Sequence, residues 1–308
     1  MKTRSDVGIL ADNSKAAMPS SSFIRAIYQM MKPTISLLVV VTVLPTLIMA
    51  NGSIPSLQLT IVTLLGTFLA SGSAGIFNHL ADSDIDGYMV RTSSRPLPTG
   101  KVSQPVAFAV ASILGVGSFV LLYQLATPLA AWIALAANGF YVLVYTMFLK
   151  RRTVQNIVIG GAAGAVGPLI GWAAVESTLA WPAWYLFAVI FLWTPPHFWA
   201  LAIKYKDDYA KANIPMMPSV RGVPSTKKQI FGYTLLLIPP VALLYTGGYA
   251  GLTYLILCSG LTGYFIYLAY KLLISKEETQ AMPLFYYSCF YLFGIFGALT
   301  LDQLIFLK

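Results

Sequence analysis

One short stretch of an otherwise apolar chain gathers acids, an amide and arginines. Asn78, Asp82 and Asp86 are spaced so that, on a helix, their side chains would share one face. Carboxylates at this spacing repel one another unless a cation lies between them, and carboxylate and amide oxygens are the ligands that Mg²⁺ prefers. Arg91 and Arg95 follow closely, and guanidinium groups match the geometry of phosphate oxygens. The stretch therefore predicts a site for magnesium and a diphosphate.

A simpler interpretation of this stretch is a solvated acidic loop that neighbouring arginines neutralise. Its position favours the functional interpretation, because Asn78 directly follows an apolar segment that contains the small residues 70–75. Ionisable groups at the point where a chain leaves the membrane usually mark a functional cavity. Asp84 would lie about 160° around the helix from Asp86, so we expect it to contribute less.

A second polar stretch runs from Lys204 through Asp207 and Asp208 to Arg221. Aligning Asp208 with the earlier Asp82 brings the two arginines Arg95 and Arg221 into register, and the pattern Arg-x-x-Pro-Ser/Thr-x-Lys begins at each of them. The two stretches follow the second and the sixth apolar segments. They therefore indicate a four-helix pseudo-repeat that places both loops on equivalent corners of a bundle, facing one cavity.

The segments that carry these stretches are too apolar for a soluble protein. Of the 308 residues, 57% are apolar and 10% are charged, whereas soluble domains average about 25% charged residues. A membrane-spanning helix needs roughly 20 apolar residues, and turn signals divide the uncharged stretches into segments of that length. The sequence predicts an all-α polytopic membrane protein with nine transmembrane helices, over residues 33–50, 57–80, 103–123, 129–149, 154–175, 182–203, 229–246, 250–271 and 283–303.

Basic residues predict how the helices are oriented. With a cytoplasmic N-terminus, all of the 20 Lys and Arg residues except Lys308 fall in cytoplasmic segments, as the positive-inside rule requires. The formal charge of +9 is explained in this way, so no nucleic-acid partner is expected. Residues 1–24 are expected to form a polar cytoplasmic segment and residues 25–308 the membrane domain. The expected location is the cell (inner) membrane, with the polar loops on the cytoplasmic side.

An apolar cavity covered by two polar loops fits a substrate that has an apolar tail and a diphosphate head. Metal and Arg/Lys contacts would stabilise the departing diphosphate, because such groups act where negative charge develops. The allylic carbocation left behind would need an electron-rich acceptor and protection from water. The chemistry that these residues predict is prenyl transfer.

The residues from Asn78 to Leu97 resemble the first aspartate-rich motif of the UbiA-type intramembrane prenyltransferases. Residues 156–164, 193–199 and 205–209 are similar to segments of one branch of that superfamily, the haem O synthases or protohaem IX farnesyltransferases. The resemblance extends from residue 25 to near residue 300. It implies that farnesyl diphosphate is joined to a vinyl group of haem b, giving haem O for terminal oxidases. The second motif of the superfamily usually spaces its acids by three residues, whereas this chain has the adjacent pair Asp207 and Asp208.

The resemblance also implies a role for each matching residue. Asn78, Asp82 and Asp86 would hold Mg²⁺ on the diphosphate. Asp207 and Asp208 would hold a second metal ion, with Asp208 as the ligand, or would orient the neighbouring lysines. The residues implied to bind the diphosphate are Arg91, Arg95, Lys204, Lys206 and Arg221. The partners implied are farnesyl diphosphate, haem b as a substrate and not a cofactor, the lipid bilayer, and a haem A synthase or the terminal oxidase assembly.

The two histidines both adjoin the polar loops. His197 lies within the sixth expected helix, and a buried imidazole can be an axial ligand of haem iron. His79 precedes Asp82 by less than one helical turn, and we expect haem contact less strongly there. Alternatively, each histidine is a hydrogen-bonded packing residue, and His197 would satisfy backbone groups that Pro195 and Pro196 free.

Two other functions are compatible with these features. A sibling prenyltransferase would use the same diphosphate site with a quinone-precursor or chlorophyll-type acceptor. A transporter with a cytoplasmic Mg²⁺ gate would need ionisable groups along a path across the membrane, whereas only Glu176 and Asp302 lie near the other side. The charge distribution therefore favours a closed cavity.

Overall fold

The computed structural model describes residues 20–89 and 92–306, and all of its regular elements in that part are helices. Nine segments there are long and apolar enough to span a membrane, which confirms the nine expected helices. They are α2 (Pro33–Asn51), α3 (Leu57–Ala81), α4 (Gln104–Leu125), α5 with η2 (Pro128–Gly139, Phe140–Leu149), α6 with α7 (Asn156–Gly164, Gly167–Glu176), α8 (Trp181–Lys204), α11 with α12 (Gly222–Leu235, Ile238–Thr246), α13 (Leu252–Ile274) and α14 (Ala281–Phe306).

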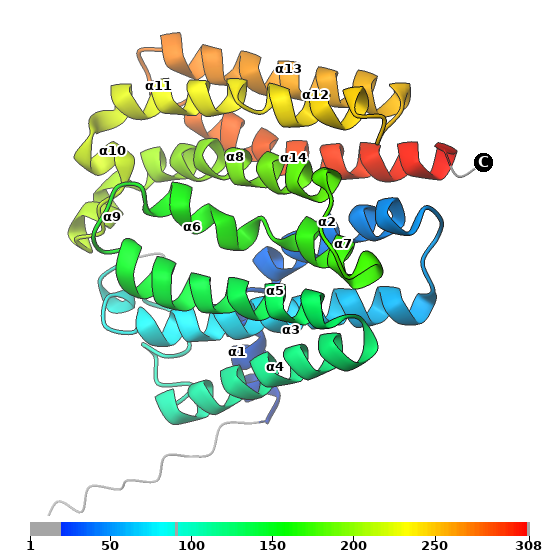
Figure 1. Ribbon diagram of the computed structural model, residues 1–308. Helices are drawn as coiled ribbons and strands as arrows, with labels where there is room; N and C mark the ends of the chain where they lie inside the picture. Colours follow the sequence, from blue (N-terminus) through cyan, green and yellow to red (C-terminus); the bar gives the residue numbers. More distant parts are fainter. Residues whose placement is uncertain (1–19, 90–91, 307–308) are drawn as a thin grey trace, which may run out of the picture.

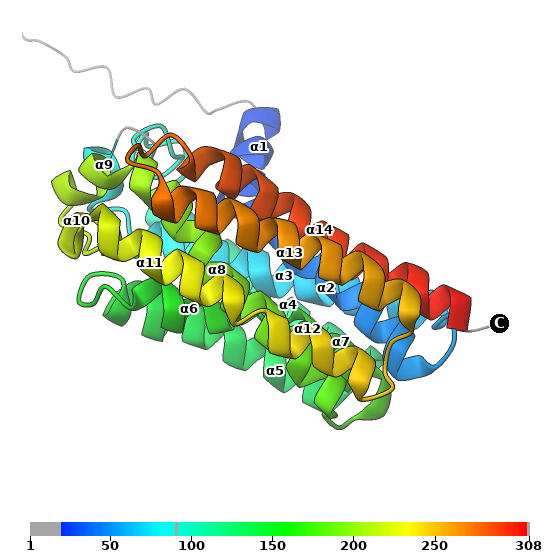
Figure 2. The same ribbon diagram turned by 90° about the horizontal axis from the view of Figure 1, so that it is seen from above.

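The spanning helices lie side by side in an elongated bundle (Figure 1). One end of the bundle carries the loop after α3, the loop after η2, and the short helices α9 (Lys206–Lys211) and α10 (Met217–Val220), at the left of both views (Figure 2). The described end of α14 lies at the opposite end of the bundle. The two predicted polar loops therefore lie at the same end.

The helices of the first half pack in an order that recurs in the second half. In the first half, α3 packs against α2 and α4; in the second, α8 packs against α6 and against α11 with α12. The halves meet where α2 packs against α7, and α14 covers α13, α8 and α2. This arrangement has the form expected of a four-helix pseudo-repeat followed by one further helix.

The structure corrects the start of one spanning helix and adds a helix before the bundle. The seventh spanning helix begins at Gly222 and not at 229, because the turns that carry Lys227 and Lys228 are already helical. Lys227 Nζ donates to the carbonyls of Ser275 and Glu277, so charge marks the end of the apolar segment and not the end of the helix. A further helix, α1 (Ser20–Met30), precedes the bundle within the stretch expected as a lead-in, and packs against α3.

Two spanning segments near the cavities depart from a regular α-helix. The fifth breaks between Gly164 and Gly167, and Pro168 lies in the first turn of α7, because proline has no N–H to continue the hydrogen bonds of the preceding helix. In the fourth, η2 is a π-helix of 10 residues, a conformation that is rare outside functional sites. Irregular backbone is tolerated at membrane depth where it lines a cavity. Both irregularities border the cavities described next.

Candidate functional site

A polar cavity of about 300 Å³ lies at the end of the bundle that carries the polar loops. It is bounded by α2, α3, η2, the loop after α3 and the segment around α9. We call it the head cavity. Its polar lining residues include Lys32, Asn78, His79, Asp86, Thr92, Ser94, Arg95, Tyr141, Tyr145 and Lys150.

The first acidic motif reaches this cavity by a different local structure from the expected one. Helix α3 ends at Ala81, with Asp82 as its C-cap, and Asp86 begins the short 3₁₀ helix η1 (Asp86–Tyr88). The prediction that Asn78, Asp82 and Asp86 lie on one continuous helix was therefore wrong for Asp86. The chain still turns back on itself, because Asp86 N donates to Asp82 O at 2.9 Å. All three side chains are buried at this end of α3.

Each buried aspartate of the motif is engaged by a cation. Lys150 Nζ lies 2.5 Å from Asp82 Oδ2, which also accepts a hydrogen bond from Asn78 Nδ2 at 2.9 Å. Arg95 Nη1 lies 2.7 Å from both carboxylate oxygens of Asp86. An unpaired buried carboxylate would be costly, so these cations offset the burial of the acids.

Asp84 lies apart from the cavity lining, on the exposed side of the loop. Arg151 donates to both of its carboxylate oxygens at 2.7 Å. This hydrogen-bonded guanidinium holds the pKa of Asp84 below its ordinary value. Asp84 is thus a member of an exposed ion pair with Arg151, and it does not line the head cavity.

Two lysines that the sequence alone did not assign to the site line the head cavity. In the sequence they served only as basic residues that predict how the chain is oriented in the membrane. Burial lowers the pKa of Lys150, and the neighbouring carboxylate of Asp82 opposes that shift. Lys32 Nζ donates to Asn78 Oδ1 and, at 3.3 Å, to the hydroxyl of Tyr141. The backbone of Lys32 has φ 52°, which is uncommon for a residue other than glycine and occurs often at functional sites. The one available signal was its position next to Pro33, at the membrane boundary.

The second polar loop contributes a different wall from the one expected. Lys204, Asp207 and Arg221 are exposed, and Asp208 is half-buried. Lys206 lies 2.7 Å from Glu278, and this carboxylate raises the pKa of Lys206. None of these five residues lines the head cavity, and their roles stay predictions. The residues of this half of the chain that do line it are Phe198, Tyr209, Ile214 and Met216.

Arg91 falls outside the described residues, so its expected contact with phosphate stays a prediction.

Within residues 20–89 and 92–306, no three His, Cys, Asp or Glu side chains converge on a point where they alone could hold a metal ion. Of the predicted oxygen donors, Asn78 and Asp86 line the head cavity, and Asp82 lies behind them, in contact with the lining residues Asn78 and Lys150. Asp82 Oδ1 is buried without a hydrogen-bond partner in the described part, with Arg151 Nη2 at 4.0 Å. This donor set, with one buried carboxylate oxygen unpartnered in the described part, fits Mg²⁺, which is held by few protein groups together with waters and phosphate.

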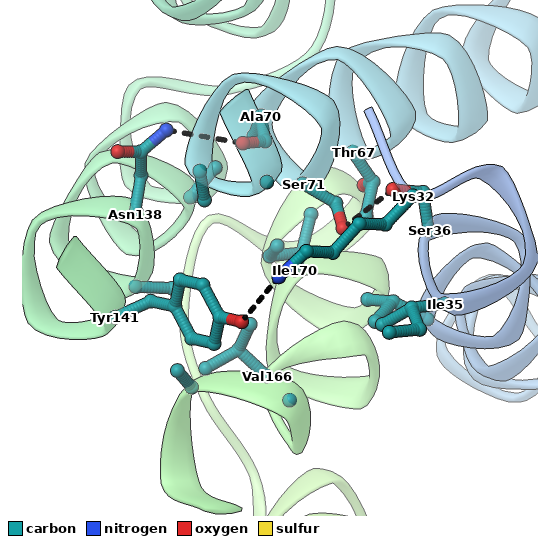
Figure 3. Close-up of a pocket in the computed structure, with 17 residues that line it drawn as sticks. Lys32, Ile35, Ser36, Thr67, Ala70, Ser71, Asn138, Tyr141, Val166 and Ile170 are labelled. Atoms are coloured by element: carbon teal, nitrogen blue, oxygen red, sulfur yellow. Dashed lines mark hydrogen bonds between the residues drawn. The ribbon is translucent and has the colours of Figure 1, made fainter. Parts of the chain in front are cut away.

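Two apolar cavities share lining residues with the head cavity. The first, of about 80 Å³, runs between α2, α3, α5 and the break between α6 and α7 (Figure 3). We call it the narrow cavity. Its wall consists largely of small residues, and Lys32 and Tyr141 close its polar end, where their side chains point toward each other (Figure 3). Asn138 donates to the carbonyl of Ala70 at 3.0 Å on its other side.

The second apolar cavity, of about 210 Å³, lies between α2, α6, α8 and α14, and we call it the aromatic cavity. Its lining residues include Tyr141, Tyr145, Trp193, His197 and Phe198, opposite the glycines of α6. Ile35 and Tyr141 line all three cavities, which therefore meet at these two side chains.

The structure separates the two histidines. His79 is buried against the head cavity, and its Nδ1 has no hydrogen-bond partner among the described residues. His197 lines the aromatic cavity, and its Nδ1 lies 2.7 Å from Ser288 Oγ on α14. The packing interpretation of His197 expected a bond to backbone freed by the prolines of α8, whereas Nδ1 bonds a side chain on another helix. Haem contact by either histidine stays a prediction.

The chain is similar in sequence to curated prenyltransferases. The chain is 46% identical over 278 residues to a protohaem IX farnesyltransferase of Gloeobacter violaceus, covering 90% of this chain and 91% of that one. It is 45% identical over 279 residues to protohaem IX farnesyltransferase 1 of a Shewanella species, covering 91% and 93%.

Solved structures share the fold at low sequence identity. A digeranylgeranylglyceryl phosphate synthase superposes with a TM-score of 0.78 at 17% identity, covering 92% of this chain and 99% of the other. A UbiA homologue from Archaeoglobus fulgidus, bound to dimethylallyl diphosphate and Mg²⁺, superposes with a TM-score of 0.64 at 16% identity, covering 90% and 99%. The family model for UbiA prenyltransferases matches residues 39–295. With nine spanning helices in its described part and this match over most of its length, the chain belongs to the UbiA prenyltransferase family.

Proposed function

We propose that this membrane protein transfers the farnesyl group of farnesyl diphosphate to a vinyl group of haem b and that water then adds to the carbocation formed on the vinyl group, so that diphosphate and a proton are released and haem O is formed. The observation that carries the proposal is the meeting of a cationic head cavity with two apolar cavities at Ile35 and Tyr141. A diphosphate, a prenyl chain and an apolar acceptor can be brought together only where such cavities join. The relatives named protohaem IX farnesyltransferase identify the prenyl group and the acceptor.

The head cavity would bind the diphosphate through its own cations. Lys32, Arg95 and Lys150 point charged groups into it, and each would donate to oxygens on which negative charge develops as the carbon–oxygen bond breaks. Asn78, Asp82 and Asp86 would hold Mg²⁺ there, which when bound neutralises the leaving diphosphate. Arg95 and Lys150 are paired with two of these acids, so they are held in place for the incoming phosphates.

The apolar cavities would divide the two remaining reactants by shape. The narrow cavity, lined by small side chains, fits a thin isoprenoid chain. The aromatic cavity, whose lining combines glycines of α6 with aromatic rings, fits part of a porphyrin ring. Their meeting point at Tyr141 would bring the allylic carbon near the vinyl group and keep water away from the carbocation.

The orientation of the chain and its partners belong to the same proposal. The head cavity would lie on the cytoplasmic side of the cell membrane, because the positive-inside rule favours that side for the basic loops. Residues 25–308 would form the prenyltransferase domain, preceded by the polar segment 1–24. Haem O would pass to a haem A synthase or into a terminal oxidase. Asp207, Asp208, Lys204, Lys206 and Arg221 would act at the rim of the cavity, where phosphate enters.

Incubating the purified protein with labelled farnesyl diphosphate and either haem b or 4-hydroxybenzoate tests this proposal. We expect label in a haem product that co-chromatographs with haem O, and none in the quinone precursor. Expression in a host that lacks haem O, followed by haem extraction, gives the matching result in cells. Label in 4-hydroxybenzoate alone would assign the chain to a sibling activity, and label in neither acceptor would overturn the proposal.

A further inference from the structure

Two side chains of α8 hold one residue of α14. Trp193 Nε1 donates to the backbone carbonyl of Ser288 at 2.8 Å, and His197 Nδ1 lies 2.7 Å from Ser288 Oγ. Trp193 and His197 are one helical turn apart and their rings stack at 4.3 Å. Phe285 stacks on His197 at 4.8 Å. The imidazole is therefore sandwiched between two aromatic rings and cannot rotate freely.

The hydroxyl of Ser288 determines which imidazole nitrogen carries the proton. Ser288 Oγ also lies 2.6 Å from the carbonyl oxygen of Phe285. Two oxygens at this distance need a proton between them, and the carbonyl has none, so the hydroxyl donates to Phe285 O. Ser288 Oγ has no second proton to give and must accept from His197. The proton consequently lies on His197 Nδ1, and Nε2 keeps its lone pair.

This lone pair belongs to a side chain that lines the aromatic cavity. His197 is half-buried there, and the structure shows no hydrogen bond from its Nε2 to any residue in the described part. A neutral imidazole whose Nδ1–H is held by a neighbouring oxygen is the form in which histidine binds metals, because the second hydrogen bond fixes both tautomer and ring direction. The iron of haem b is the metal that the proposed acceptor would bring.

We propose that Ser288 is a positioning residue, which holds His197 as the Nδ1–H tautomer so that Nε2 binds the iron of haem b during farnesyl transfer. The inference rests on the proposed function and extends it. His197 would anchor the macrocycle in the aromatic cavity through its iron, while the stacked rings of Trp193 and Phe285 keep the imidazole in one plane. Ser288 would touch neither reactant and would act only through His197.

The test compares haem b with iron-free protoporphyrin IX as ligands of the full-length protein in nanodiscs. Binding is followed by the Soret band for both. Ser288→Ala should weaken haem binding roughly 10–100-fold, as loss of a group that orients a metal ligand does, and should raise KM for haem. Protoporphyrin IX should bind as well as before. His197→Gly should lose the nitrogen-ligated Soret spectrum, and added imidazole should restore it.

Thr262→Val is the matched control. Thr262 is another buried hydroxyl between α13 and α14, 3.2 Å from the Tyr291 hydroxyl, and does not line the aromatic cavity. It should leave both ligands unaffected. If Ser288→Ala weakens haem and protoporphyrin IX equally, or leaves the haem spectrum and affinity unchanged, the positioning role is overturned. Wild-type farnesyl transfer to haem b is measured in the same preparation, and its absence would overturn the proposed function itself.

Discussion

Lys150 Nζ lies 2.5 Å from Asp82 Oδ2, a contact that joins the end of η2 to the end of α3 beside the head cavity. Both side chains are largely removed from solvent, and Asn78 donates to the same carboxylate oxygen. Asp82 Oδ1 is left without a hydrogen-bond partner in the described part. One carboxylate thus has one oxygen engaged by a cation and an amide, and a second oxygen that a metal ion could use.

We expect Asp82→Ala to abolish farnesyl transfer and to remove the Mg²⁺ dependence of farnesyl diphosphate binding. The substitution removes a metal-binding oxygen and leaves Lys150 buried without its carboxylate. Loss of one group that stabilises developing charge costs about 10²–10³ in rate, so turnover should fall by at least that factor. The measurement is product formation against Mg²⁺ concentration.

Asp84→Ala serves as the control for Asp82, since Asp84 is two residues away and forms an exposed pair with Arg151. Exposed ion pairs contribute about 0–1 kcal/mol, so activity should stay near that of the wild type. Turnover by Asp82→Ala with Mg²⁺ chelated would count decisively against the metal site.

Lys150→Met should weaken the binding of farnesyl diphosphate and leave haem binding intact. A hydrogen bond to a charged group contributes about 1.5–3 kcal/mol, so affinity should fall roughly 10–100-fold. Calorimetric titration measures this loss. Arg152→Met is the matched control, because Arg152 lies over the ring of Phe148, outside the head cavity. Equal losses in the two variants would mean that overall charge, and not a specific contact, binds the diphosphate.

Apolar segment length and turn residues were sufficient to predict the spanning helices, since both follow from the thickness of the bilayer. The first acidic motif was found for the same reason, because acids at the membrane boundary are conspicuous. The local structure of this motif was not predicted. Four-residue spacing cannot show that α3 ends at Ala81 and that Asp86 lies in a 3₁₀ helix after it. Helix ends of this kind are decided by tertiary contacts, here by Arg95 and Lys150.

Of the cations at the site, the sequence likewise predicted some and missed others. Arg95 was predicted because it follows the acids in sequence, whereas Lys32 and Lys150 reach the head cavity from other helices. Their long side chains cross between helices, and no local pattern records such a crossing. For the second polar loop, the sequence predicted charged side chains at the cavity, and the structure does not find them among its lining residues. Similar sequences in the two halves do not require matching side chains to point in the same direction. The aromatic and apolar residues of this loop line the cavity, while Lys206 pairs with Glu278.

Gly160→Ala should impair both stability and activity. A Cβ atom on Gly160 would overlap Tyr145 Cδ2, and Tyr145 lines the head and aromatic cavities. Forcing an extra methyl into a packed site costs about 1–3 kcal/mol. Gly117→Ala, where a Cβ atom meets nothing within 4 Å, should be neutral or slightly stabilising. Thermal unfolding and turnover check both variants, and a fully active Gly160→Ala would show that Tyr145 does not shape the site.

Ala134→Leu should discriminate between long and short prenyl diphosphates. Ala134 lies about two turns from Tyr141 along the same span, so its side chain borders the deeper part of the narrow cavity. Excluding two or three methylene groups costs about 2 kcal/mol, or roughly 30-fold in the affinity for farnesyl diphosphate. Dimethylallyl diphosphate, whose chain is too short to reach Ala134, provides the internal control. If both diphosphates lose affinity equally, the narrow cavity does not hold the prenyl tail.

Asp302→Ala should destabilise the protein without changing the chemistry. Asp302 is buried at the end of the bundle opposite the head cavity, where its carboxylate accepts from Gly251 N at 2.7 Å and from Tyr254 N at 3.1 Å. It thereby caps the first turn of α13, and loss of the cap leaves two buried donors unpaired, at a cost of about 1–3 kcal/mol each. Thermal unfolding should show a lower Tm, whereas Gln303→Ala should not, because this half-buried neighbour makes only a solvent-exposed hydrogen bond to Tyr249 O. Because Asp302 is held by backbone of the same chain, kcat for farnesyl transfer should be retained below the Tm; loss of kcat with an unchanged Tm would instead place this carboxylate on a path used in turnover.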